Sequence, residues 1–224
     1  GQATVFEPAV DGDAVFVGFS LHEGATSGGV ARLDARSGRV LWTTWFPRTG
    51  DAHEHLDRTG GPLVVDDVVY ASARDGNIYA FDRRTGGIRW ALPRLTGPFG
   101  GFITDTDTDY RGLVRAGRLL VAGSATGTVV AYDLDSRQER WRYTGGEWGS
   151  TAFVLGADAT RVFVPFFGGF IVTLDAASGE PVWRFGDYRL GCMWPPDPAG
   201  EVVYVAGSYG GYYAVTPTAT EPEP

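Results

Sequence analysis

Lysine is absent from this chain of 224 residues, and cysteine, methionine and asparagine each occur once. Because Cys192 stands alone, no disulfide can form within the chain, and the redox compartment stays open. There is no run of 18 apolar residues, so we expect no membrane span, and we expect no secretory leader. All 19 basic residues are arginine, yet the net charge of −8 argues against nucleic acid as a partner, because phosphates require a basic surface.

An aspartate followed eight residues later by a tryptophan occurs four times along the chain. A hydroxyl residue lies three positions after each aspartate, and a glycine lies six positions before it. Successive aspartates are 48, 51 and 42 residues apart, which is the range of propeller blades and long solenoid repeats. A fifth copy keeps Gly210 but has Thr216 where the aspartate would be. The four pairs are Asp34/Trp42, Asp82/Trp90, Asp133/Trp141 and Asp175/Trp183.

Each repeat predicts four short antiparallel strands. In the second copy, the extended piece 61–65 and the apolar run 68–70 lead to a tight turn at Gly76, where a positive φ costs glycine little. A strand then runs to Asp82, the chain turns again, and a last strand carries Trp90. With no helical periodicity, the repeats predict an all-β protein, a β-propeller of about five blades.

The second copy reads Ala80-x-Asp82-x-x-Thr85-Gly86-x-x-x-Trp90. This pattern resembles the tryptophan-docking repeat of the quinoprotein-type, PQQ-binding-like β-propeller family. The resemblance implies that each motif tryptophan is structural and is buried between neighbouring blades, and that the Asp-to-Gly turn is structural too. It also implies an extracytoplasmic location, periplasmic or secreted. In the third copy Arg137 replaces the turn glycine, so we expect that turn to be less regular.

We predict a single propeller over residues 1–216 and a disordered acidic, proline-containing tail over 217–224. The fifth repeat lacks its tryptophan strand, so we expect residues 2–6 to close the ring by pairing with residues 212–215. The rival interpretation is a fragment of a larger ring, because the family more often has seven or eight blades. The expected blades lie near residues 7–47, 61–94, 110–143, 150–185 and 192–216.

Three connections, 18–29, 46–61 and 94–110, are longer than the repeat requires, and the repeat order places them on one face. Long loops on a rigid scaffold often bind partners. All three histidines of the chain lie in the first two, beside carboxylates, and this is a ligand set for a transition metal. The alternative is three solvated histidines. The candidate metal ligands are His22, Glu23, Asp51, His53 and His55.

Two further groups of residues are candidates for ligand or partner binding. The alternating carboxylates of the third long loop suggest a calcium loop, but Tyr110 and Ala116 stand where glycine and glutamate are needed, which favours a simple acidic loop. Aromatic and charged residues expected near the central mouth could anchor a ligand or peptide, or could fill the channel. The residues of the two groups are Asp105, Asp107, Asp109, Tyr110, Trp148, Asp187, Arg189 and Trp194.

The cofactor PQQ is not expected. Its family ligand set uses glutamate and asparagine around calcium and often adjacent cysteines, whereas this chain has one cysteine, and its one asparagine, Asn77, lies in a tight turn. No nucleophile motif is present either. We therefore predict a non-catalytic binding or assembly module for a protein or small ligand. The alternatives are a metal-dependent enzyme that uses His22, His53 and His55, and a quinoprotein dehydrogenase.

Overall fold

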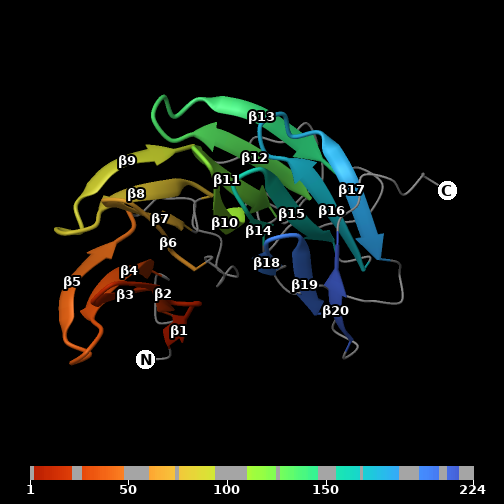
Figure 1. The fold of residues 1–224 in the computed structure, drawn as a ribbon. Coiled ribbons are helices and arrows are strands. Elements are labelled where there is room, and N and C mark those ends of the chain that lie inside the picture. The colour runs from red at the N-terminus through yellow and green to blue at the C-terminus, as the bar shows by residue number, and fades with distance from the viewer. Residues whose placement is uncertain are drawn as a thin grey trace. The chain divides into compact units, whose positions relative to one another are not determined.

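The computed structural model describes residues 3–21, 27–47, 61–73, 76–93, 110–124, 127–145, 155–166, 169–186, 197–206 and 211–216. All regular structure in these ranges is β-strand, so the predicted all-β fold is confirmed (Figure 1). The chain divides into two compact units, Gly1–Leu113 and Val114–Pro224.

The first unit contains two antiparallel sheets. In the first, the order is β1-β3-β4-β5, and β2 also pairs with β3. The second is a regular four-stranded blade in the order β6-β7-β8-β9. The strands are β1 (Ala3–Val5), β2 (Ala9–Asp11), β3 (Ala14–Leu21), β4 (Ser27–Asp34), β5 (Val40–Trp45), β6 (Leu63–Val65), β7 (Val68–Ser72), β8 (Ile78–Asp82) and β9 (Ile88–Leu92).

The remaining sheets follow the same sequential order, and the third sheet begins just before the unit boundary. Two of them, β10-β11-β12-β13 and β14-β15-β16-β17, have four strands, and the last, β18-β19-β20, has three. The strands are β10 (Tyr110–Ala116), β11 (Leu119–Ser124), β12 (Thr128–Asp133), β13 (Glu139–Thr144), β14 (Gly156–Ala157), β15 (Arg161–Phe166), β16 (Phe170–Asp175), β17 (Pro181–Gly186), β18 (Asp197–Ala199), β19 (Val202–Ala206) and β20 (Tyr212–Val215).

The burial of a strand follows from its place in the blade. The middle strands β7 and β8 are buried on both faces and are accordingly rich in β-branched and aromatic residues. The outermost strands alternate, as in β5, because only one of their faces packs on the core. In all four complete blades the pairing of the last two strands shifts register just before the motif aspartate, at a β-bulge. Because the bulge falls at the same position in each blade, the tryptophan keeps a constant place relative to the aspartate turn.

The glycines six residues before the aspartates do not all make the same turn. Gly76, Gly127 and Gly169 have left-handed φ values of 80°, 77° and 83°, as expected for a tight turn. In the first blade β3 and β4 are longer, and Gly28 pairs with Ser20 inside the ladder. Gly28 therefore lies within a strand pair and not at a turn, unlike its three counterparts.

The N-terminal strand forms a ladder within the first sheet. β1 pairs antiparallel with β3, with Val5 opposite Phe19, so residues 3–5 belong to the first sheet. β3 is long enough to pair with β2 at one end and β1 at the other. A short connection favours this local ladder, and the expected pairing of residues 2–6 with 212–215 is not shown and stays a prediction.

Candidate functional site

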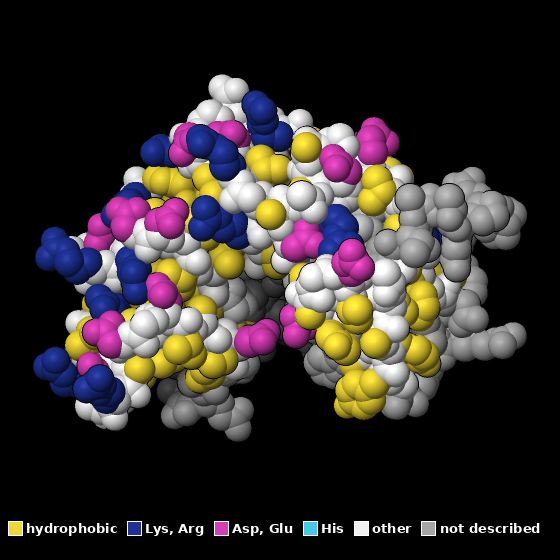
Figure 2. Space-filling model, viewed as in Figure 1, with side chains coloured by type: hydrophobic (Ala, Val, Ile, Leu, Met, Phe, Trp, Pro, Cys, Tyr) yellow, Lys and Arg dark blue, Asp and Glu magenta, His cyan; other side chains and the backbone are white. Residues whose placement is uncertain are grey.

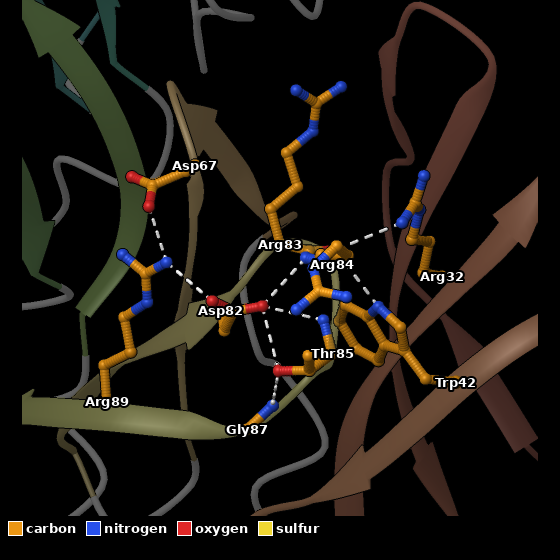
Figure 3. A network of polar contacts seen from close by, with 9 residues as sticks. All are labelled: Arg32, Trp42, Asp67, Asp82, Arg83, Arg84, Thr85, Gly87 and Arg89. Atoms are coloured by element: carbon orange, nitrogen blue, oxygen red, sulfur yellow. Dashed lines mark hydrogen bonds and ion pairs between the residues drawn. The ribbon is translucent and has the colours of Figure 1, made fainter.

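The turn between β8 and β9 shows how the repeat motif works (Figure 3). The Oδ1 atom of Asp82 accepts hydrogen bonds from the backbone N of Arg84 at 3.0 Å, the backbone N of Thr85 at 2.7 Å and the Thr85 hydroxyl at 2.9 Å. The backbone N of Gly86 donates to the carbonyl oxygen of Asp82 at 2.8 Å. The carboxylate thus fixes the turn by binding its backbone donors.

Arg89 connects this turn to the start of the blade. Its Nη2 donates to Oδ2 of Asp82 and to Oδ2 of Asp67, at 2.6 Å each (Figure 3). The hydrogen bond from Arg89, followed by those from Thr85, holds the pKa of Asp82 well below its usual range. A carboxylate that stays ionised and has its lone pairs engaged is a poor general base, so this group serves the structure.

The same turn receives a tryptophan from the first blade. The indole Nε1 of Trp42 donates to the carbonyl oxygen of Arg83 at 3.1 Å, and the Thr44 hydroxyl donates to the carbonyl oxygen of Gly86 at 2.7 Å. A Cβ on Gly86 would lie 2.7 Å from Cδ2 of Trp42. The glycine is therefore required twice, by its φ of 76° and by the close approach of the indole ring.

Arginines and aspartates reinforce this junction between the first two blades. Arg83 forms an ion pair with Asp11 at 2.6 Å, while Arg32 donates to the carbonyl oxygen of Arg83 at 3.5 Å and lies 3.9 Å from Asp13. The Arg32 guanidinium also lies over the ring of Phe16, 5.9 Å from its centroid. Sequence reasoning missed this network, since its partners are far apart in the chain.

The second unit contains a matching junction. Trp141 donates through Nε1 to the carbonyl oxygen of Ala176 at 2.8 Å, and a Cβ on Gly179 would lie 2.6 Å from its Cδ2 atom. Only Trp141, with 8% of its surface exposed, reaches the full burial that we expected. The half-buried motif tryptophans are Trp42, Trp90 and Trp183.

The turn of the third repeat is as regular as the others, which corrects the expectation from Arg137. Arg137 adopts a φ of 61°, and its backbone N donates to the carbonyl oxygen of Asp133 at 2.8 Å. Ser136 donates to the carboxylate of Asp133 through both its backbone N and its hydroxyl. These bonds hold the turn in its left-handed shape although the residue there is not glycine.

The predicted binding and metal-ligand residues do not lie where the structure can test them. Tyr110 begins β10, but its side chain is not described. In the ranges that the structure does describe, no three His, Cys, Asp or Glu residues form a group that could hold a metal ion. The residues outside those ranges, which stay predictions, are His22, Glu23, Asp51, His53, His55, Asp105, Asp107, Asp109, Trp148, Asp187, Arg189 and Trp194.

Sequential four-stranded sheets, joined by tryptophans seated on aspartate turns, define a β-propeller of the tryptophan-docking class. The family model described as outer membrane protein assembly factor BamB matches residues 2–143 and 125–220. The chain belongs to this family, which confirms the resemblance seen in its repeats.

Relatives of this chain include longer proteins. BamB from Kangiella koreensis is 31% identical over 164 residues, covering 70% of this chain and 39% of the relative. Quinohemoprotein alcohol dehydrogenase from Comamonas testosteroni is 29% identical over 146 residues, covering 58% of this chain and 20% of the enzyme. The crystal structure of BamB from Moraxella catarrhalis has a TM-score of 0.65 at 21% identity, covering 96% of this chain and 63% of that one. The chain thus spans less than two thirds of each of these three proteins.

Among the described residues there is no helix long and apolar enough to cross a membrane.

Proposed function

We propose that the chain is a non-catalytic assembly module that binds a protein partner through its three long connections, 18–29, 46–61 and 94–110. The observation that carries the proposal is membership of the family described as outer membrane protein assembly factor BamB. The proposal also places the chain outside the cytoplasm, in keeping with the outer membrane named in that description.

The distribution of charge supports the long connections as the partner surface. On the scaffold, several charged side chains pair with one another, as Arg89 does with Asp67 and Asp82. In the sequence of the three connections, acidic residues outnumber arginines. Net negative charge on loops steers association with an oppositely charged surface, so the partner surface should be basic.

The motif aspartates favour binding over catalysis. Hydrogen bonds from Ser37, Ser136 and Ser178 lower the pKa values of the first, third and fourth of them, as the bonds to Asp82 do in the second blade. Each is therefore committed to a turn. The relationship to a quinohemoprotein dehydrogenase covers only a fifth of that enzyme, and it supports shared blades rather than a shared reaction.

Complementation tests the assembly function directly. The chain, fused to an export signal, is expressed in a bacterial strain that lacks its own BamB, and the amount of folded outer-membrane protein is measured. We expect partial restoration. If the exported, folded chain restores nothing, the proposed assembly function is wrong.

A charge-neutralising variant then tests the loop surface. Replacing Asp105, Asp107 and Asp109 by asparagine should lower the restored level several-fold, because the steering charge is lost. The matched control, Asp197→Asn with Glu201→Gln, removes exposed acids from the last sheet and should restore as the unchanged chain does. Equal restoration by both variants would place the partner surface away from the third connection.

A further inference from the structure

The outermost strand of the first sheet has a free edge. β5 lies at the end of its sheet and, among the described strands, pairs with β4 alone (Figure 1). The backbone N of Phe46 donates to the carbonyl oxygen of Gly28 at 2.9 Å. Because bonded and non-bonded pairs alternate along an antiparallel ladder, this contact puts Thr43 and Trp45 in the non-bonded pairs. Their backbone N–H and C=O groups therefore point away from β4, at the free edge.

The side chains that flank this edge carry no charge. Trp42 and Thr44 bond to the second blade, so the residues that alternate with them lie on the other side of the strand. These are Leu41, Thr43 and Trp45; all three are exposed, Leu41 at 38% and Trp45 at 47%. Figure 2 shows hydrophobic side chains at the surface over the strands of this sheet. An uncharged edge strand is open to pairing, because charged side chains on an edge are a common means of preventing it.

The outermost strands of the other complete blades are protected at the same place. The residue after the motif tryptophan is Thr43 in β5, but it is Arg142 in β13 and Arg184 in β17. In β9 it is Ala91, and the next outward position is Pro93, which has no N–H to offer a further strand. Among the four complete blades, β5 is thus the outermost strand that has neither device.

β5 is also complementary to a second copy of itself. In an antiparallel pair with a two-fold axis at Thr43, this residue lies opposite the partner's Thr43, and Leu41 lies opposite the partner's Trp45. Threonine pairs and pairs of aromatic with aliphatic side chains are favourable across strands. The same arrangement of β13 or β17 would set Arg142 or Arg184 directly opposite its own copy, where like charges repel.

We propose that two copies of the chain associate by antiparallel pairing of β5 with β5 about a two-fold axis at Thr43. The backbone N of each Thr43 donates to the carbonyl oxygen of the other, and the two first sheets become one continuous sheet. A strand matches the row of backbone groups at this edge, and β5 matches itself in its side chains. The contact is one strand wide and buries little area, so the dimer is weak and reversible. This association is independent of the proposed assembly function.

Sedimentation over a hundredfold range of concentration, up to millimolar, tests the association. We expect a monomer in dilute solution and a reversible dimer in concentrated solution. Thr43→Arg gives β5 the residue that protects β13 and should weaken association at least tenfold, whereas Thr43→Val keeps an uncharged β-branched side chain and should associate as the unchanged chain does. The matched control, Ala91→Arg, places the same charge at the equivalent exposed position of β9 and should leave the dimer intact. Equal melting temperatures in dilute solution show that the variants are folded.

Amide hydrogen exchange locates the contact. In concentrated solution the amides of Thr43 and Trp45 should exchange more slowly than in dilute solution, whereas those of Trp42 and Thr44, which face β4, should change little. A chain that stays a monomer at the highest concentration overturns the proposal and leaves the edge to a strand of another protein. A dimer that Thr43→Arg retains overturns it too, as does one that forms without slower exchange at Thr43 and Trp45.

Discussion

One turn position, four residues after the motif aspartate, should respond to substitution according to whether an indole ring is seated on it. The position is occupied by Gly38, Gly86, Arg137 and Gly179, and all four have φ between 61° and 77°. Alanine in this conformation costs about 1–2 kcal/mol, of which about 0.4–1 kcal/mol is offset because alanine restricts the unfolded chain. Gly38→Ala should therefore lower the free energy of unfolding by about 1 kcal/mol.

The cost rises where an indole ring is seated on the glycine. In Gly86→Ala and Gly179→Ala the new Cβ would lie 2.7 and 2.6 Å from the ring, so the tryptophan or the turn must shift. Overpacking of this kind adds about 1–3 kcal/mol. We expect a total loss of about 2–4 kcal/mol for each of these two variants. The difference from Gly38→Ala measures the docking contact, because the backbone strain is common to all three.

Arg137→Gly should show the opposite sign. It removes the strain of a left-handed arginine but adds freedom to the unfolded chain, so we expect a gain of up to about 1 kcal/mol. Urea unfolding followed by circular dichroism measures all four variants, and a change of 1 kcal/mol corresponds to about 2–4 °C in melting temperature for a chain of this size. Equal losses in Gly38→Ala and Gly179→Ala would refute the docking argument.

Three further predictions concern the tryptophan, the aspartate turn and the histidine loops. Trp141→Ala should cost about 3–5 kcal/mol in urea unfolding, and a loss below 1 kcal/mol would mean that the indole is not core. The pKa of Asp82 is lowered on folding, so its contribution to stability is complete above about pH 4 and is lost as the pH falls further. Removing its partner with Arg89→Met should flatten the fall in melting temperature between pH 5 and pH 3, and parallel curves would contradict this assignment. Zinc binding, measured by titration, should weaken below about pH 6.5 and be lost in His53→Ala/His55→Ala; equal binding by the variant would exclude this metal site.

The sequence predicted those features that recur at a constant spacing. The separation of eight positions from Asp34 to Trp42, or from Asp175 to Trp183, spans a turn, a bulge and part of a strand, all of which are local. The spacing therefore fixes strand order and the residues that meet at each junction. The spacing does not depend on the individual turn residue, which is why Arg137 could replace glycine without disturbing the turn.

Features particular to one blade could not be predicted in this way. Arg32 lies two residues before its aspartate, where the other repeats have alanine or threonine, and this departure from the repeat was the only signal of its contacts. Its partner Arg83 lies 51 residues away, and Arg83 reaches Asp11 over 72. The position of β1 depends on the length of β3, which a short apolar pattern does not define. The histidine loops have no repeat equivalent, so neither the spacing nor the described residues locate their side chains.

The docking turns explain why binding should be confined to the long connections. The turns of the second and fourth blades use their aspartate, hydroxyl residue and glycine for the junction with the preceding blade, so a substitution there changes stability before it changes recognition. Arginines beside the turns are likewise paired, as in Arg83 with Asp11. The connections 18–29, 46–61 and 94–110 lie outside these junctions in the repeat, and their length and sequence can vary without loss of a docked tryptophan. A family that keeps one scaffold and changes partners would therefore vary these three segments, and the acidic residues in them are where selection for a particular partner would act.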